Sequence, residues 1–220
     1  MRHRVICDSS SLISMSMNCM IPIVVELSES ADFVITKSVY DEIITNPKRL
    51  GRLMMAPLNF SALVRNGVLN VESADQDDVK GILDMSNNIY YAHHKPLTII
   101  QKGEAEALSL ACGGGTLLID ERTLRFLVES PYELKSLLNF RMHRGITMSA
   151  ERLEIFQKHC RGVDIIRSSE LVAIAYEKGI LEKYFEGDKK DVLSACLWSL
   201  KSKGCSLSNS DIEDYLKMLG

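Results

Sequence analysis

The sequence has no apolar run that approaches the roughly 20 residues a transmembrane helix needs. Its start is basic, but the apolar stretch that follows reaches Asp8 almost at once, which is too short for the apolar region of a signal peptide. Low-complexity tracts and internal repeats are also absent, and the 5 prolines and 13 glycines are scattered. We therefore expect a cytoplasmic protein with no membrane partner.

Cysteine is present, but the spacing typical of cysteine chemistry is not. No two cysteines form a CxxC pair, and no Cys/His spacing resembles that of a zinc site. Several cysteines lie within apolar runs, which predicts small buried side chains in a reducing compartment. The six are Cys7, Cys19, Cys112, Cys160, Cys196 and Cys205.

The charge balance of the whole chain does not indicate a nucleic-acid partner. Apolar residues make up 46 % and charged residues 25 %, as in average globular proteins, and the net charge is −3. The basic residues are unevenly placed, however. Between Arg122 and Arg167 nine Lys and Arg stand against five Asp and Glu. This segment is either an ordinary solvated face or a phosphate-binding patch beside an acidic site.

The order of apolar segments predicts the fold class. A chain of 220 residues is long enough for one α/β domain with additions. Because strands that alternate with helices are typical of parallel sheets, we expect a three-layer α/β/α fold around a central parallel sheet. The expected strands are residues 4–7, 32–36, 68–71, 116–119 and 163–166.

The domain organisation follows from the same segments. We expect the α/β domain to span residues 1–183, with residues 133–160 as a helical insertion. Two further helices, near 188–202 and 210–219, are expected to form a C-terminal helical appendage that begins at about residue 184.

Two of the expected strands end in an aspartate. Asp8 follows residues 4–7, and Asp120 follows residues 116–119. Ligands of open α/β sheets bind beyond the carboxyl ends of the strands, so these positions are candidates for a site. One such aspartate is often only a helix cap, but two at equivalent positions are a stronger indication.

Further candidate acids lie at expected helix starts. Glu42 comes four residues after Ser38, an expected helix cap. Glu104 and Glu106 are two residues apart, which is about 200° around a helix, so they cannot both face one site. Glu106 is flanked by two alanines, which would let its carboxylate approach a crowded sheet edge. Taken alone, each of these acids is more often a solvated surface group.

In this order the motifs resemble those of the PIN-domain nucleases. A strand with an aspartate and serines corresponds to residues 5–10, Val-Ile-Cys-Asp-Ser-Ser. A helix start with a glutamate corresponds to residues 39–43, Val-Tyr-Asp-Glu-Ile. The family's third acid lies in a helix just before an alanine. Residues 103–108, Gly-Glu-Ala-Glu-Ala-Leu, look like the form that this motif takes in some prokaryotic members. A second strand-end acid corresponds to residues 117–122, Leu-Leu-Ile-Asp-Glu-Arg.

The resemblance implies a divalent-metal-dependent endonuclease with a site of several acids and a serine. Two assignments stay open. The third acid is Glu106, favoured by the Glu-Ala step, or Glu104. The fourth is Asp120 or Glu121, since family members often place an aspartate one residue further from the strand. The expected site residues are Asp8, Ser10, Glu42, Glu106 and Asp120, with Glu104 and Glu121 as alternative metal ligands.

A cluster of carboxylates also has its own physical logic. Carboxylates held close together repel, and their pKa values rise unless a cation neutralises them. Mg²⁺ and Mn²⁺ take oxygen ligands and are the expected cofactors. We expect Asp8 and Asp120 to bind the metal, with Glu106 as a further direct or water-mediated ligand. Glu42 would orient a water or a second metal, and Ser10 would bond a carboxylate or the phosphate.

The resemblance favours RNA over DNA as the substrate. RNA phosphates are repelled by an acidic site unless basic residues lie nearby. The candidates are Arg122, Arg125, Arg141 and Arg144, which could equally be surface charges paired with acids of their own helices. PIN proteins commonly form homodimers, and some are inhibited by an antitoxin-type protein. A second copy of this chain and an antitoxin-type inhibitor therefore both remain candidate partners.

Two other classes compete with the nuclease. One is a PIN-like RNA-binding or assembly module with a degenerate site. The other is a phosphotransfer or phosphatase domain with Asp8 as nucleophile. The haloacid-dehalogenase pattern requires an aspartate at position 10, where this chain has Ser10.

Overall fold

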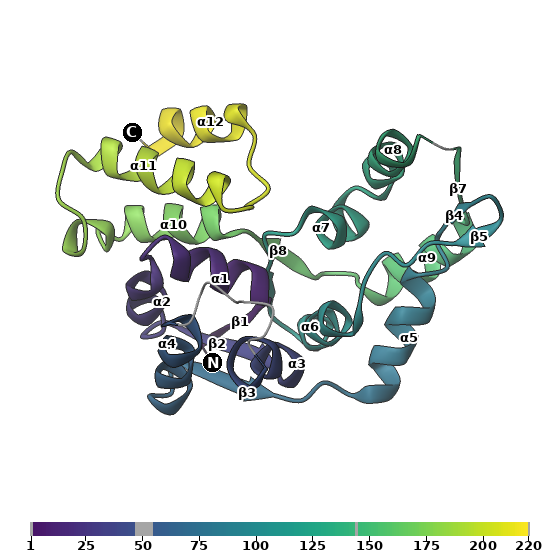
Figure 1. Ribbon diagram of the computed structural model, residues 1–220, viewed down its shortest axis with the longest axis horizontal. Coiled ribbons are helices and arrows are strands. Elements are labelled where there is room, and N and C mark those ends of the chain that lie inside the picture. The colour runs from purple at the N-terminus through teal and green to yellow at the C-terminus, as the bar shows by residue number, and fades with distance from the viewer. Residues whose placement is uncertain (1, 47–54, 144, 220) are drawn as a thin grey trace.

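The computed structural model describes residues 2–46, 55–143 and 145–219. A five-stranded, fully parallel sheet forms its centre, in the order β3-β2-β1-β6-β8 (Figure 1). This confirms the predicted three-layer α/β/α architecture. The strands are β1 (His3–Cys7), β2 (Ala31–Thr36), β3 (Leu69–Glu72), β6 (Thr116–Leu118) and β8 (Asp164–Ile166).

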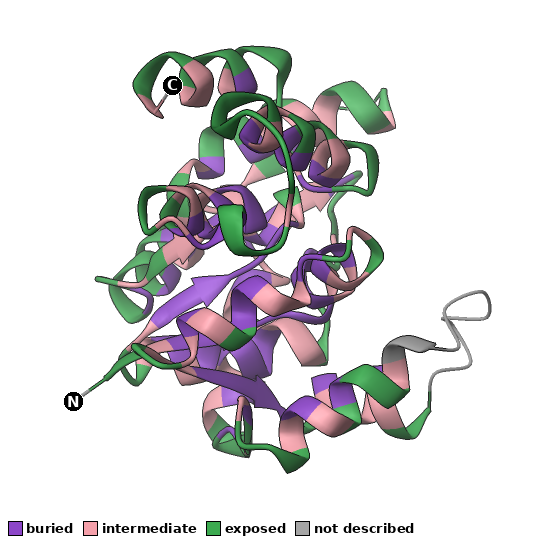
Figure 2. Ribbon diagram, turned by 90° about the vertical axis from the view of Figure 1, so that its left-hand side faces the viewer, coloured by how far each residue is buried: buried purple, intermediate pink, exposed green. Residues whose placement is uncertain are grey.

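Alternating side chains of the central strands divide the core into two layers. Successive residues of a strand point to opposite faces of the sheet. In β1, Val5 and Cys7 join one buried cluster while Ile6 joins the other, and in β6 Leu118 is separated from Leu117 in the same way. Figure 2 shows these strands buried, with helices around them that are exposed on their outer sides.

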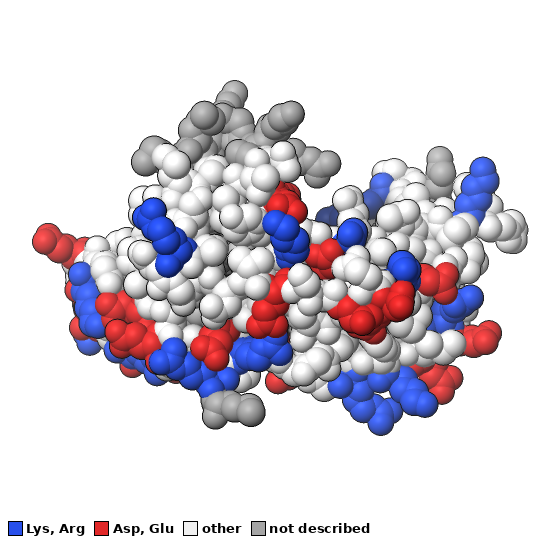
Figure 3. All heavy atoms as spheres, turned by 90° about the horizontal axis from the view of Figure 1, so that it is seen from below, with Lys and Arg blue, Asp and Glu red and all other residues white. Residues whose placement is uncertain are grey.

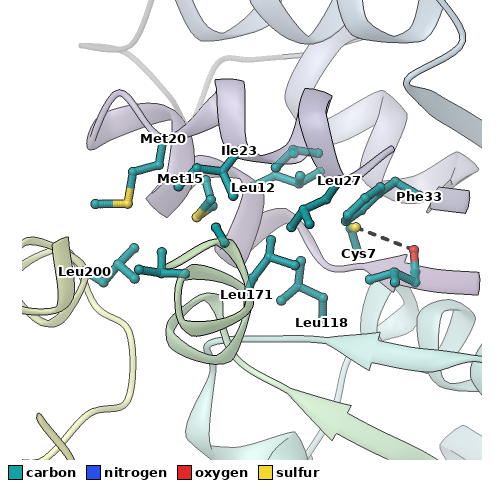
Figure 4. Close-up of a cluster of buried hydrophobic side chains, with 14 of the residues drawn as sticks. Cys7, Leu12, Met15, Met20, Ile23, Leu27, Phe33, Leu118, Leu171 and Leu200 are labelled. Atoms are coloured by element: carbon teal, nitrogen blue, oxygen red, sulfur yellow. Dashed lines mark hydrogen bonds between the residues drawn. The ribbon is translucent and has the colours of Figure 1, made fainter. Parts of the chain in front are cut away.

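One face of the sheet is covered mainly by the N-terminal and C-terminal helices. Leu12, Met15 and Ile23 pack there against Leu171 and Leu200 (Figure 4). Apolar side chains from both ends of the chain therefore fill one layer. The helices of this layer are α1 (Ser9–Met17), α2 (Ile21–Leu27), α4 (Met55–Arg65), α10 (Ser168–Glu177) and α11 (Lys189–Ser202).

The other face is covered by the middle of the chain. Ala105 and Leu108 of α6 pack there with Ile82 and Leu124. Ala105, a small residue, is fully buried in this layer. The helices of this layer are α5 (Gln76–Ser86), α6 (Lys102–Cys112), α7 (Arg122–Glu129) and α9 (Ala150–His159).

The segment 133–160 is not helical throughout. It contains the end of α8 (Pro131–Met142), strand β7 (Ile146–Met148) and α9. β7 pairs antiparallel with β4 (Tyr90–Ala92), which also pairs with β5 (Lys95–Pro96) to give a second, three-stranded sheet. The expectation of a purely helical insertion misses β7, because a three-residue strand is stabilised by a partner more than 50 residues away and not by its local sequence.

The two expected C-terminal helices are present as α11 and α12 (Asn209–Leu219). α11 is not detached from the α/β domain. Leu193, Leu197 and Leu200 are fully buried in the same cluster as Val5 and Cys7 of β1. The C-terminal helices therefore complete a core layer of the domain.

No single helix in the described parts of the chain has both the length and the apolar composition to cross a bilayer. α1 and α2 meet these two criteria only when counted together, and they are bent by 117° relative to each other.

A substitution in α11 tests whether the C-terminal helices share the domain core. Leu197→Ala should lower the free energy of unfolding by roughly 2–5 kcal/mol, because it opens a cavity in a fully buried position. Met218→Ala, at a site 81 % exposed, should change it by less than about 0.5 kcal/mol. Urea denaturation followed by circular dichroism measures both. A separate, early transition for α11 would contradict the shared core.

Candidate metal site

Carboxylates from four parts of the chain line one cavity beyond the carboxyl ends of β1 and β6. Its volume is about 230 Å³. Asp8 follows β1, Glu42 follows β2, Glu104 begins α6 and Glu121 begins α7. A parallel sheet brings these separate segments to one edge, as the strand-end argument predicts. The lining residues are Asp8, Ser9, Ser10, Val39, Glu42, Gln101, Gly103, Glu104 and Glu121.

Asp8 is fixed by the start of α1. It is the N-cap of that helix, and its Oδ2 accepts hydrogen bonds from the Ser10 amide at 3.0 Å and the Ser10 hydroxyl at 2.6 Å. Its own amide donates to the Leu118 carbonyl at 3.0 Å, which ties it to β6. Asp8 is only 8 % exposed. The carboxylate is therefore held in one orientation with one oxygen already bonded.

Glu42 lies in an irregular helical turn. β2 is followed by α3 (Lys37–Tyr40), which continues into a π-helix, η1 (Asp41–Thr45). The cap of α3 is Thr36, whose hydroxyl accepts from the Val39 amide at 3.1 Å, so the expected cap at Ser38 is wrong. A π turn holds more residues than an α turn and is frequent at functional sites, and this one carries Glu42 at the cavity.

Glu104 is oriented by a capping box at the start of α6. Its Oε2 accepts from the Gln101 amide at 2.8 Å. Burial first, and then the nearby charges of Asp8, Glu121 and Glu42, raise the pKa of Glu104 to about 7, while the Gln101 bond acts in the opposite direction. The acids of the cavity are therefore close enough to repel one another electrostatically.

Glu121 is the N-cap of α7. Its carboxylate accepts hydrogen bonds from the Leu124 amide at 3.0 Å and from the Thr123 hydroxyl at 2.7 Å. The pKa of Asp8 is also raised, first by burial and then by the charge of Glu42, while its bonds to Ser10 and Ser9 act in the opposite direction. Burial and mutual repulsion thus oppose ionisation at two of the four acids.

Glu106 and Asp120 do not line the cavity. The Glu106 carboxylate is buried, accepts from the Ser38 amide at 3.2 Å and lies 3.6 Å from the Lys102 ammonium, so it ties α6 to α3. Asp120 is also buried, and accepts from the Ser168 amide and hydroxyl, both at 2.8 Å. Of the alternatives that the sequence leaves open, the geometry brings Glu104 and Glu121 to the cavity.

The three expected arginines that the structure describes, Arg122, Arg125 and Arg141, are not part of the cavity lining. Arg122 Nε and Arg125 Nη2 donate to the Ser206 hydroxyl at 3.0 and 3.3 Å, in the loop before α12. Arg141 is exposed in the last turn of α8, and Arg144 lies outside the described residues. Red and blue side chains are mixed on the face in Figure 3.

Gln101, Gly103 and Ser9 line the cavity without having been expected there. Ser9 adjoins Asp8 and Gly103 adjoins Glu104, whereas Gln101 precedes Glu104 by the three residues of a capping box, which was the available signal. Among the described residues, only the Cβ of Ser38 lies within 4 Å, at 3.9 Å, of the position that a Cβ added to Gly103 would occupy.

The chemistry of the lining fits a hard divalent cation. Carboxylate and hydroxyl oxygens are the donors that Mg²⁺ and Mn²⁺ prefer, and a cation would relieve the repulsion that raises the pKa of Glu104. As they stand, no three His, Cys, Asp or Glu side chains of the described residues converge closely enough to hold an ion. Coordination would therefore need side-chain movement or water-mediated contacts.

Comparison with known proteins gives no relative: no protein-family model, no curated protein and no solved structure matches the chain. The geometry of the cavity and the sequence motifs are therefore the two sources of information on function.

The raised pKa of Glu104 predicts a pH-dependent stability in metal-free protein. The folded-state pKa of about 7 lies above the ordinary 4.5, so ionised Glu104 destabilises the fold and stability falls as pH rises through this window. Glu104→Gln should therefore raise the free energy of unfolding at pH 8 by roughly 1–3 kcal/mol and change it little at pH 4.5.

Urea titrations in EDTA at the two pH values measure this difference. Glu213→Gln, which alters an exposed carboxyl of α12, is the control and should be neutral at both. Equal effects of Glu104→Gln at pH 4.5 and pH 8 would show that Glu104 ionises normally in the folded state.

Proposed function

We propose that the protein is a divalent-metal-dependent endonuclease, acting on RNA in the cytoplasm. The single observation that carries this proposal is the cavity lined by Asp8, Glu42, Glu104 and Glu121 at the carboxyl edge of a parallel sheet. Among the described residues, the cavity lining contains several oxygen donors and no strong nucleophile. Such a donor set suits phosphodiester hydrolysis with a bound cation better than covalent catalysis.

The order of the motifs along the chain supports the same proposal. An acid after the first strand, one after the second, one at the start of a helix and one after a later strand is the arrangement that resembles the PIN-domain nucleases. The fold places the four corresponding acids beside one cavity. On this proposal Glu104 and Glu121 take the third and fourth positions, in place of Glu106 and Asp120.

The cation ligands on this proposal are Asp8, Glu42, Glu104 and Glu121. Mg²⁺ or Mn²⁺ bound there would lower the pKa of a water and stabilise charge on the phosphoryl oxygens. The chain itself supplies orientation. Ser10 holds one oxygen of Asp8, which leaves Oδ1 for the cation, and the cap bonds of Glu104 and Glu121 limit their rotation.

RNA needs positive charge outside the acidic cavity. Arg122 directly follows Glu121, and the Lys102 ammonium, 62 % exposed, extends from a residue between Gln101 and Gly103 of the cavity lining. We propose that these two residues, together with Arg125, Arg141 and Arg144, contact the RNA backbone. Arg122 and Arg125 would have to exchange their bonds to Ser206 for bonds to phosphate.

A binding module without activity is the second candidate. It is favoured by the finding that, within residues 2–46, 55–143 and 145–219, no three ligating side chains converge on one point. The two candidates differ in whether Mn²⁺ binds the cavity and whether RNA is cut.

Substitution of the most constrained acid tests the activity. Asp8→Asn keeps the side-chain shape and the acceptor for Ser10, so the fold should survive. Cleavage of a single-stranded RNA in Mn²⁺ should fall by roughly 100-fold or more, because one cation ligand is lost. Gel analysis of end-labelled RNA measures the rate. DNA of the same sequence, EDTA and Asp32→Asn, which alters an acid outside the cavity lining, are the controls.

If the wild-type chain cleaves no RNA or DNA in Mg²⁺ or Mn²⁺, the binding-module alternative replaces the nuclease. Equal rates for the wild type and Asp8→Asn would show that any cleavage arises elsewhere.

A second set of variants separates site acids from structural acids. Glu104→Gln and Glu121→Gln should lose cleavage and remain folded. Asp120→Asn should lower the free energy of unfolding by roughly 1–3 kcal/mol, because an amide cannot accept from the Ser168 amide, the Ser168 hydroxyl and the Cys205 thiol as a carboxylate does. Parallel rate and denaturation measurements distinguish these effects. Loss of cleavage in fully folded Asp120→Asn would show that Asp120, and not Glu121, is the fourth acid of the site.

A further inference from the structure

A polar cluster lies at the opposite end of α6 from the acidic cavity. Asp78 of α5 accepts a hydrogen bond from the Ser109 hydroxyl of α6, and its Oδ1 lies 3.1 Å from His159 Nε2 at the end of α9. α5 packs against both of these helices. Asp78 therefore fixes the last turn of α6 and the C-terminal end of α9 to the same point.

Two cysteines flank this connection. Cys112 comes one turn after Ser109 on α6, and Cys160 directly follows His159. The two thiols are near enough to hydrogen-bond to each other. Both cysteines belong to the core layer of α6 and α9, Cys160 as a buried member and Cys112 as a partly buried one.

Cys112 is the accessible partner of the pair. It lines a cavity of about 470 Å³ together with Ser109, Asp78 and His159, whereas Cys160 is only 5 % exposed. A small reagent can therefore reach Cys112 from solvent, whereas Cys160 is buried.

The pair also favours a thiolate at Cys112. The hydrogen bond from Cys160 lowers the pKa of Cys112, against the opposing effects of burial and of the Asp78 charge. The same hydrogen bond, together with burial, raises the pKa of Cys160. The thiolate is the nucleophile in thiol–disulfide exchange, so the first attack falls to Cys112.

We propose that Cys112 and Cys160 are a redox-active thiol pair that reacts with small disulfides of the glutathione type. The Cys112 thiolate attacks one sulfur of the small disulfide, which forms a mixed disulfide and releases one thiolate. Cys160 gives its proton to that thiolate and attacks the Cys112 sulfur, which releases the second small thiol. Two protein thiols are thus oxidised to one disulfide, and one small disulfide is reduced to two thiols.

The other four cysteines do not compete for this partnership. Cys7, Cys196 and Cys205 are buried in the opposite core layer. Cys19 is exposed and follows α1. An intramolecular disulfide of Cys112 in the folded chain therefore has one candidate partner, Cys160.

The disulfide would constrain the helix that also carries Glu104. It would close the chain between residues 112 and 160 and fix the C-terminal end of α6 to the turn after α9. Such a loop restricts the unfolded chain, so oxidation should raise the Tm by roughly 5–15 °C. This inference does not depend on the proposed nuclease activity.

Disulfide mapping of the folded, full-length chain tests the pair. Reduced protein is incubated with glutathione disulfide at neutral pH, free thiols are alkylated, and peptides are identified by mass spectrometry. The expected product is a peptide joined through Cys112 and Cys160, with Cys19 bearing glutathione. Dithiothreitol should reverse both the link and the rise in Tm.

Matched variants distinguish the thiol that attacks the small disulfide, Cys112, from the thiol that resolves the mixed disulfide, Cys160. Cys160→Ser should stop at a mixed disulfide on Cys112, whereas Cys19→Ser should form the same link as the wild type. If Cys160→Ser does not fold, the wild-type peptide map decides alone. A wild-type map in which Cys112 stays alkylated, keeps glutathione or links to another chain would overturn the proposal.

Discussion

Electrostatic repulsion among four carboxylates at one sheet edge is the constraint on which the rest of the structure depends. Removing a carboxylate from water disfavours its ionised form, and a second carboxylate nearby disfavours it further. Both effects raise the pKa values of Asp8 and Glu104. A fold that keeps these acids together without neutralising them loses stability, which is the physical reason for proposing a cationic ligand.

The hydrogen bonds that begin three helices also hold the acids in place. Asp8 caps α1, Glu121 caps α7, and Glu104 completes the capping box of α6. The first turn of a helix presents free amide groups and a partial positive charge, which offset part of the repulsion between carboxylates. Each of these three acids thus lies where a strand or loop ends and a helix begins, and each lines the cavity. Separate segments of the chain can therefore build one site.

The sequence predicts the parallel sheet well and the site acids less completely. Apolar runs followed by Asp8 and by Asp120 locate β1 and β6, because buried parallel strands are continuously apolar. The choice between Asp120 and Glu121 depends on register. Cys7 pairs with Leu118, so Ile119 stands level with Asp8, and β6 ends one residue earlier than expected. The strand β7 likewise depends on its distant partner β4, and local patterns contain no information on such pairings.

The central claim is that the four-acid cavity binds a divalent cation. The most direct measurement is the anomalous scattering of Mn²⁺ soaked into crystals of the wild-type chain. The account predicts a peak within about 2.5 Å of an Asp8 oxygen and near at least one of Glu42, Glu104 and Glu121. A cavity without a peak at saturating Mn²⁺, or a peak confined to other acids, would contradict it.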